Sequence, residues 1–158
     1  MRPIAHLIKV VLLLMPLSLV LPSVTRADTC EVARAVFEPT GTRGVFALRA
    51  SEDQGQLLWQ LIIQKTGETF PFRTETDTAG QTWLVSLPRD GEDPGIRTTI
   101  RLLDGKGTET QDRRAVSGVA VFDFWKVLSE YRTRKGQPFE AGVNPPANVW
   151  DLTECRAK

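Results

Sequence analysis

Few residues in this chain could carry catalytic or metal-binding chemistry. The sequence has one histidine, His6, and two cysteines, Cys30 and Cys155. His6 lies in a segment that we expect to be removed, so the mature chain would hold no imidazole. Ser-His-Asp and Cys-His nucleophilic arrangements are then excluded, and a zinc site would have to combine the cysteines with carboxylates. Glycine motifs for phosphate loops and dinucleotides are also missing. We therefore predict no catalytic residue, no metal site and no cofactor.

Paired carboxylates are the catalytic chemistry that remains. Glycoside hydrolysis needs two acids that face each other across a cleft. The acidic groups Glu52–Asp53, Asp90–Asp93 and Asp151–Glu154 lie in expected turns or near the end of the chain. Acids in such places are typically solvated. A carboxylate-based hydrolase of envelope glycans is therefore kept as an alternative function.

Two stretches combine acidic side chains with glycine and raise the question of calcium. They are Asp90–Asp93 and Asp104–Glu109. Neither follows the register of an EF-hand loop, and Lys106 places a cation inside the second. Asp-Gly is also a common hairpin turn. We predict turns at both places.

The two cysteines lie near the two ends of the mature chain. An even pair in an oxidising compartment typically forms a disulfide, whereas a redox pair would call for a Cys-x-x-Cys spacing or a neighbouring histidine. We predict a bond between Cys30 and Cys155. On the chain-entropy model, a loop of this size stabilises the fold by about 4–5 kcal/mol. The bond would bring the first and last expected strands together.

The first 27 residues are typical of a secretory signal peptide. A positive start precedes the charge-free run Val10–Val24, and Thr25–Ala27 supplies a cleavage site. A membrane anchor is the competing interpretation, but this run is shorter than the roughly 20 residues that span a bilayer, and two prolines interrupt it. We expect residues 1–27 to be cleaved and residues 28–158 to form one periplasmic or secreted domain.

The charge of the mature chain excludes two classes of partner. Cleavage removes three basic residues and no acidic ones, so the net charge changes from +1 to −2. No long run of either sign follows, and the basic clusters Arg113–Arg114 and Arg132–Lys135 are interpreted as solvated. These charges provide no sequence-wide field for nucleic acid or for anionic lipid, so we predict no nucleic-acid partner. Separately, we expect no integral membrane segment once the signal segment is cleaved.

Alternating apolar and polar residues predict a mainly β domain. In Leu57–Gln64, for example, Trp59 and Leu61 share a face with Leu57, and a glycine-containing turn leads to a second strand with Pro71. Because proline lacks an N–H, we expect that second strand at a sheet edge. The expected strands are 31–37, 44–50, 57–64, 70–75, 82–87, 96–103, 115–121 and 149–153. About seven or eight short strands predict a small antiparallel β-sandwich or barrel.

One segment in the C-terminal half predicts an α-helix. Phe124, Leu128 and Tyr131 recur at helical spacing, Asp123 suits an N-cap, and Gly136 suits a stop. Trp and Tyr side chains are enriched at binding hot spots. We therefore take Trp125, Tyr131 and Trp150 as the candidate partner surface, with core packing as the alternative.

The segment Ser117–Phe122 contains Ser-Gly followed by Val119-Ala120-Val121 and an aromatic residue. It resembles the inhibitory loop of periplasmic lysozyme inhibitors, which are small, disulfide-stapled β-barrels. The resemblance covers a few residues and implies a class of function, inhibition of a protein partner. Gly118 could instead mark a close backbone approach inside a sheet.

Together these observations predict an exported, non-enzymatic binding or accessory module for another envelope protein, inhibitor-like or chaperone-like. A small-ligand carrier is a further alternative, which an apolar cavity inside the β core would favour.

Overall fold

The computed structural model describes residues 29–87, 95–140 and 143–157. The predicted signal segment and the acidic stretch Asp90–Asp93 lie outside these residues. The described residues form nine strands, one α-helix and a short 3-10 helix: η1 Val32–Arg34, β1 Ala35–Pro39, β2 Phe46–Asp53, β3 Gln56–Ile63, β4 Glu68–Thr76, β5 Thr82–Ser86, β6 Arg97–Leu103, β7 Glu109–Thr110, β8 Gly118–Val121, α1 Phe124–Arg134 and β9 Val149–Cys155.

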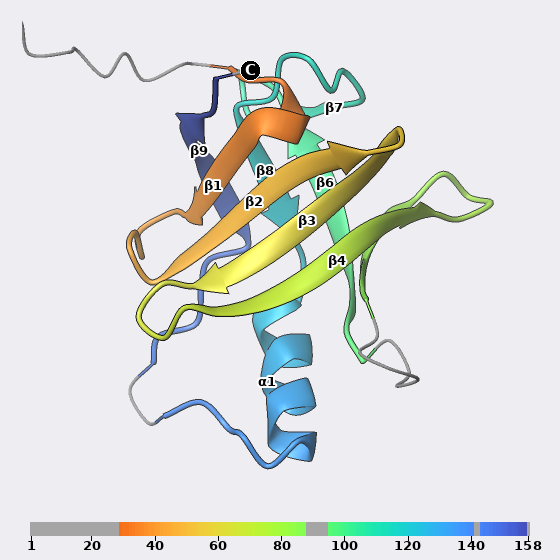
Figure 1. Ribbon diagram of the computed structural model, residues 1–158. Coiled ribbons are helices and arrows are strands. Elements are labelled where there is room, and N and C mark those ends of the chain that lie inside the picture. The colour runs from red at the N-terminus through yellow and green to blue at the C-terminus, as the bar shows by residue number, and fades with distance from the viewer. Residues whose placement is uncertain (1–28, 88–94, 141–142, 158) are drawn as a thin grey trace, which may run out of the picture.

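Eight antiparallel strands of the described chain close into a barrel (Figure 1). Their order is β5-β4-β3-β2-β1-β9-β8-β6, and pairing between β5 and β6 completes the circle. The ninth strand, β7, forms a hairpin with β6 outside this circle. The predicted small antiparallel β-structure with one helix in the C-terminal half is confirmed, and the structure decides that it is a barrel.

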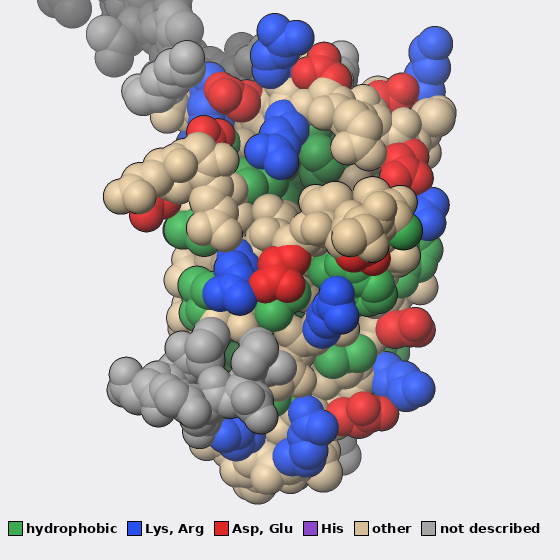
Figure 2. Space-filling model, turned by 90° about the vertical axis from the view of Figure 1, so that its right-hand side faces the viewer, with side chains coloured by type: hydrophobic (Ala, Val, Ile, Leu, Met, Phe, Trp, Pro, Cys, Tyr) green, Lys and Arg blue, Asp and Glu red, His purple; other side chains and the backbone are tan. Residues whose placement is uncertain are grey.

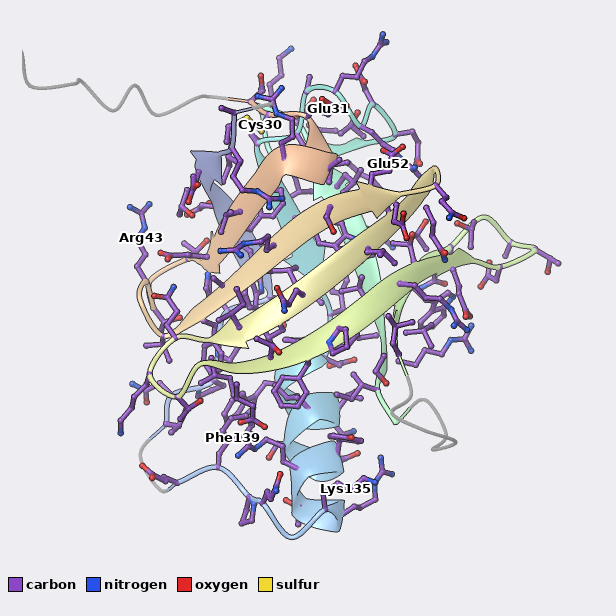
Figure 3. All side chains as sticks on the ribbon, in the orientation of Figure 1. Cys30, Glu31, Arg43, Glu52, Lys135 and Phe139 are labelled. Atoms are coloured by element: carbon purple, nitrogen blue, oxygen red, sulfur yellow. A yellow bond between two sulfur atoms is a disulfide. The ribbon has the colours of Figure 1, made fainter. Side chains whose placement is uncertain are left out.

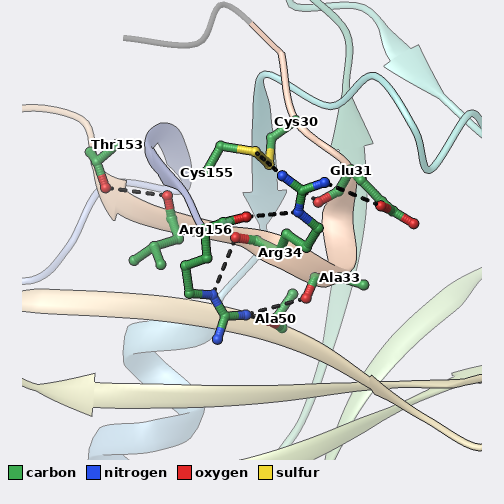
Figure 4. Close-up of a disulfide and its surroundings, with 9 residues drawn as sticks. Cys30, Glu31, Ala33, Arg34, Ala50, Thr153, Cys155 and Arg156 are labelled. Atoms are coloured by element: carbon green, nitrogen blue, oxygen red, sulfur yellow. Dashed lines mark hydrogen bonds and ion pairs between the residues drawn. A yellow bond between two sulfur atoms is a disulfide. The ribbon is translucent and has the colours of Figure 1, made fainter. Parts of the chain in front are cut away.

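The first and last strands along the chain, β1 and β9, meet at a seam of the barrel. β1 pairs with β9 from Ala35↔Cys155 to Pro39↔Trp150. At one end of this seam, the Cys30–Cys155 disulfide joins Cα atoms 5.7 Å apart (Figure 4). The predicted disulfide therefore forms a clasp between the segment before η1 and the end of β9, at one end of the β1–β9 ladder.

Two arginines reinforce this clasp (Figure 4). Arg34 Nε donates a hydrogen bond of 2.7 Å to the carbonyl of Arg156, and Arg156 Nε returns one of 3.2 Å to the carbonyl of Arg34. Arg156 Nη2 also donates to the carbonyls of Ala33 and Ala50. These bonds hold Arg156, the residue that follows β9, against η1 and β2.

Large side chains fill the barrel interior. Along β3, Leu57, Trp59, Leu61 and Ile63 are buried while the residues between them are more exposed, as the alternation predicts. The largest fully buried side chains are aromatic. They come from five different strands of the wall: Trp59, Trp150, Phe37, Phe46 and Phe72. The interior is thus a packed core.

The helix α1 closes one end of the barrel (Figure 1). Phe124 is 2% exposed, and its ring lies edge-on to Phe72 and Trp150 with centroids 6.0 Å from each. Asp123 does precede the helix, but it has φ 54° and its side chain makes no capping hydrogen bond. Gly136, with φ 70°, ends the helix as predicted, and its N–H bonds to the carbonyl of Thr133.

The expectation that Pro71 marks a sheet edge is wrong, because β4 lies between β3 and β5. The ladder with β5 starts at Phe72, one residue after the proline. The carbonyl of Pro71 accepts from Leu87 N at 2.9 Å, so its ring nitrogen faces the same side, just past the end of β5. The missing N–H of Pro71 therefore removes no hydrogen bond from the β4–β5 ladder, which begins at Phe72.

Two further boundaries differ from the sequence prediction. The segment Glu31–Phe37 begins with the turn η1, because Arg34 N bonds to the carbonyl of Glu31 before β1 starts. The two-residue strand β7 was not predicted, since it is too short to show alternation.

Gly118 marks a close backbone approach, and the substitution Gly118→Ala should lower the free energy of unfolding by about 1–3 kcal/mol. A Cβ atom there would lie 2.9 Å from the carbonyl oxygen of Trp150 in the β8–β9 ladder. Urea denaturation measures the loss. Gly105→Ala is the matched control, because its nearest neighbour would be a methyl group 3.9 Å away. Equal losses for the two variants would contradict this explanation.

Candidate functional site

The barrel wall is interrupted on one edge of β6. β5 pairs with Arg97–Thr99 of this strand, and β7 pairs with Leu102 and Leu103. Between these two ladders lies a pocket of about 250 Å³, which we call the notch. It is lined by Leu57, Trp59, Thr74, residues 79–82, 99–102 and 109–111, and Arg113. Figure 2 shows this side of the molecule, where acidic and basic side chains are interspersed and hydrophobic ones are visible in the hollows.

The inner wall of the notch includes a tryptophan with an unsatisfied polar group. Trp59 is 2% exposed, and its indole Nε1 has no hydrogen-bond partner among the described residues. Two other buried polar atoms share this condition, Nε1 of Trp150 and Oγ1 of Thr42, but neither residue lines the notch. A buried donor without a partner costs roughly 1–3 kcal/mol. Trp59 thus lines the notch, while its indole N–H is buried and has no acceptor within the described residues.

Polar side chains surround the opening of the notch. Gln81 Nε2 donates a hydrogen bond of 2.9 Å to Thr99 Oγ1, which links the β4–β5 turn to β6. Arg101 Nη1 bonds to Glu109 Oε2 at 3.0 Å. Arg113 is exposed, and no hydrogen bond or ion pair of its guanidinium is found within the described residues. One cationic group at this opening is thus available to a ligand.

The β4–β5 turn that forms one side of the notch is held by Asp77. Its Oδ1 accepts the N–H groups of Ala79 and Gln81 at 3.0 and 2.9 Å, and its Oδ2 accepts the indole N–H of Trp83 at 3.0 Å. The hydrogen bond from Trp83 and then that from Gln81 hold the pKa of Asp77 below its ordinary value of 3.8. The turn is organised by a charged acceptor.

This geometry predicts an acid-sensitive turn. The unfolded chain binds a proton on Asp77 at higher pH than the folded chain does, so the stabilisation by Asp77 is complete above its ordinary pKa. It is lost as the pH falls through the lower pKa of the folded state. Urea midpoints of the wild type and Asp77→Asn should differ at neutral pH and converge as the pH falls through the lowered pKa of Asp77 in the folded state. A difference that is independent of pH would contradict this role.

The residues predicted as a partner surface lie elsewhere. Trp150 is fully buried in the barrel, so it is a core residue and not part of a surface. Trp125 lies on α1, stacked on Phe139 with ring centroids 4.4 Å apart, and Figure 3 shows Phe139 beside the helix. The ring of Tyr131 covers Gly95, where a Cβ would lie 2.4 Å from Tyr131 Cδ2. Both half-buried side chains are at the closed end of the barrel, and their role in binding stays a prediction.

The acidic stretch Asp104–Glu109 forms a turn. Asp104 Oδ1 accepts the N–H groups of Lys106 and Thr108, each at 2.9 Å, and closes the β6–β7 hairpin. These bonds lower the pKa of Asp104, the one from Thr108 most. No group of three or more potential metal ligands occurs among residues 29–87, 95–140 and 143–157.

The other acids weighed as catalytic pairs lie on different strands. Glu52 and Asp53 end β2 and are exposed, whereas Asp151 and Glu154 belong to β9. The acidic side chain that lines the notch, Glu109, is held by Arg101.

The segment that resembles an inhibitory loop lies inside the sheet. Gly118 and the valines and alanine after it form β8, which is buried and pairs with β6 and β9. Ser117 Oγ donates to the carbonyls of Leu103 and Asp104. The alternative interpretation, a close backbone approach at Gly118 inside a sheet, is therefore the one that the structure shows.

Sequence reasoning placed Trp59 on one face of an expected strand and Arg113 in a solvated cluster, and the burial of both residues is compatible with these interpretations. No sequence signal brings them to one pocket, because the interruption of the barrel wall arises from where β5 and β7 stop pairing with β6. Within the described residues, no helix has the length and hydrophobicity needed to cross a membrane.

Comparison with protein families, with curated proteins and with solved structures finds no match to this chain. Its function has to be argued from the geometry of the notch.

Proposed function

We propose that this protein is an exported, non-enzymatic binding module that receives one anchor side chain of a partner protein in the notch. The observation that carries the proposal is a pocket of about 250 Å³ beside β6, where polar side chains surround the opening and the buried residue Trp59 forms part of the inner wall. A partner side chain that fills this pocket would be shielded from water, as anchor residues at protein interfaces typically are.

The size of the notch favours a single side chain over a complete small ligand. Pockets that hold drug-sized ligands typically measure about 300–1,000 Å³. Interfaces between proteins often centre on one or two anchor residues that fill pockets of smaller size. A carrier of an apolar ligand is less favoured, because aromatic side chains fill the barrel interior.

A glycan hydrolase finds no support in the charges around the notch. A general acid would need a desolvated carboxyl group with a raised pKa. Glu109 instead makes an ion pair with Arg101, and about half of its side-chain surface is exposed. The binding module therefore remains the better proposal.

Export is the second part of the proposal. The predicted signal segment and the Cys30–Cys155 disulfide both favour an oxidising compartment. Mass spectrometry of the protein from its native host should give a mature chain that starts near Asp28. A chain that retains residues 1–27 in the cytoplasmic fraction would overturn this part.

Site-directed photo-crosslinking in the native host tests the binding site. A photo-reactive amino acid in place of Gln111, which is exposed and lines the notch, should capture one envelope protein. The same amino acid in place of Lys126, on the exposed side of α1, should not.

Two tryptophan substitutions in one turn provide the matched controls. Ala79→Trp fills the notch and should abolish the adduct formed at Gln111. Thr78→Trp adds the same side chain to the exposed neighbour, which does not line the notch, and should preserve the adduct. If no adduct forms, or if Ala79→Trp leaves it unchanged, the notch is not the binding site.

A further inference from the structure

We infer that the partner binds through an extended segment, which adds to the sheet as a further strand beside β7 and places the anchor side chain in the notch. This inference rests on the proposed function, and it adds the conformation of the partner at the same site. It follows from the free edge of β7 and from the position of this edge beside the notch.

Within the described residues, β7 is the one strand that has a neighbouring strand on only one side. Each of the eight barrel strands pairs with strands on both of its sides, whereas β7 pairs with β6 alone. It lies at the end of the barrel away from α1 (Figure 1). A strand with one neighbour presents unpaired N–H and carbonyl groups, and an extended peptide can pair with them. The described part of the barrel therefore offers a single edge for strand addition.

The pairing of β7 shows which of its backbone groups are free. Asp104 N donates a hydrogen bond of 2.9 Å to the carbonyl of Thr108, and successive residues of an antiparallel strand face their partner alternately. Thr108 and Thr110 therefore face β6, whereas Glu109 directs its N–H and its carbonyl toward the outer edge. The backbone groups of Gln111, two residues further along, also have no hydrogen-bond partner within the described residues. Both residues thus offer a donor and an acceptor to an added strand.

The side chains of this segment leave the edge open. Edge strands that resist pairing typically carry a proline or an uncompensated charge. Residues 105–112 include no proline. The charged side chain of β7, Glu109, is directed toward β6 by its ion pair with Arg101, in which Arg101 Nη1 lies 3.0 Å from Glu109 Oε2. Glu109 and Gln111 are both exposed, so another backbone can reach the edge.

The register of β7 directs one side chain of the added strand into the notch. Thr110 lies directly opposite Leu102 in the β6–β7 ladder, and both residues line the notch. Residues directly opposite each other in a ladder share a face of the sheet. The partner residue that lies opposite Thr110 therefore points to the notch, and its two neighbours along the strand point away from it. This residue is the anchor.

An extended segment suits this edge better than a helix does. A helix bonds its own N–H and carbonyl groups internally, so it would leave those of Glu109 and Gln111 without a partner. An added strand pairs with them and brings alternate side chains to the notch. Because β7 has only two residues, the strand gains few backbone hydrogen bonds, and the anchor in the notch has to supply the remaining affinity.

Two substitutions at one position separate the backbone from the side chain. Glu109→Pro removes the outward N–H, which takes no part in the β6–β7 ladder, whereas Glu109→Ala removes the same carboxylate and keeps this N–H. With the photo-reactive amino acid in place of Gln111, the adduct yield of Glu109→Pro should fall about fivefold or more below that of Glu109→Ala. The amide of Thr110 faces β6, so its slow hydrogen exchange in both variants verifies that the hairpin is intact.

Hydrogen exchange in the crosslinked complex is the second measurement. The adduct formed from position 111 is purified from the native host, and exchange is measured by mass spectrometry with fragmentation to single residues. In the free protein, the amide of Glu109 faces solvent and should exchange fast. In the adduct its exchange should slow about tenfold or more, because it donates to the added strand. The amide of Gly105, in the exposed hairpin turn, is the control and should exchange at an unchanged rate.

The outcomes separate this inference from the proposed function. Equal adduct yields for Glu109→Pro and Glu109→Ala with intact hairpins would overturn strand addition, and so would unchanged exchange of the Glu109 amide in the adduct. If the proline loosens the hairpin, the exchange measurement decides. An adduct between two copies of this chain would also overturn the inference, because β7 would then pair with its own counterpart. If crosslinking from position 111 still depends on an open notch after strand addition is overturned, the proposed function stands with a partner of another conformation. If no adduct forms, both fall.

Discussion

The double variant Cys30→Ser/Cys155→Ser should have a free energy of unfolding about 4–5 kcal/mol below that of the wild type. The disulfide joins residues separated by 125 positions, so its loss releases almost the whole described chain in the unfolded state. It also removes the covalent clasp at the β1–β9 seam, where the barrel closes. Chemical denaturation at equilibrium measures the change.

Reduction of the wild type provides the control for this variant. Alkylation without reductant should leave the mass of the mature protein unchanged, and alkylation after reduction should add two groups. The reduced wild type should then be as unstable as the serine variant. A loss below about 1 kcal/mol would show that the β1–β9 ladder and the bonds of Arg34 and Arg156 hold the seam without covalent help.

Phe124→Ala should lower the free energy of unfolding by about 3–5 kcal/mol. The ring is almost fully buried and lies edge-on to Phe72 and Trp150, so its removal opens a cavity where α1 meets the barrel. Calorimetry should show a lower melting temperature, and amide exchange in α1 should accelerate more than exchange in β2 and β3.

The matched control lies two residues away. Phe122→Ala removes the same ring from a position that is 39% exposed, where it is in contact with the guanidinium of Arg101. This change should cost less than about 1 kcal/mol. Similar losses at positions 122 and 124 would mean that α1 does not depend on its first residue to close the barrel.

Much of the fold could be predicted because its signals are local. The alternation in Leu57–Gln64 depends on which side chains face inward, and a strand exposes that period directly in the sequence. The helix over Phe124–Arg134 is marked by its apolar spacing and by Gly136, which takes the positive φ that ends it. The cysteines were paired by elimination, since the chain offers no other partner for either.

The wrong predictions concern features that the tertiary structure decides. Pro71 tolerates an interior strand because β5 ends next to it. Trp150 was placed on a surface because tryptophan is common at interfaces, but the strand β9 turns its side chain into the barrel. Asp123 precedes the helix without capping it, since the chain leaves β8 through a left-handed residue.

By itself, the sequence determined the approximate number of strands and the single helix, because spacing along one strand or helix encodes them, and it determined the disulfide, because the chain has only two cysteines. It also excluded histidine-based chemistry from the expected mature chain. Only the tertiary structure decided that the sheet closes into a barrel and that its wall opens beside β6. Trp59 and Arg113 both line this notch because the β5–β6 and β6–β7 ladders end on either side of it. The end of a ladder depends on both of its strands, so it cannot be predicted from one segment of the sequence.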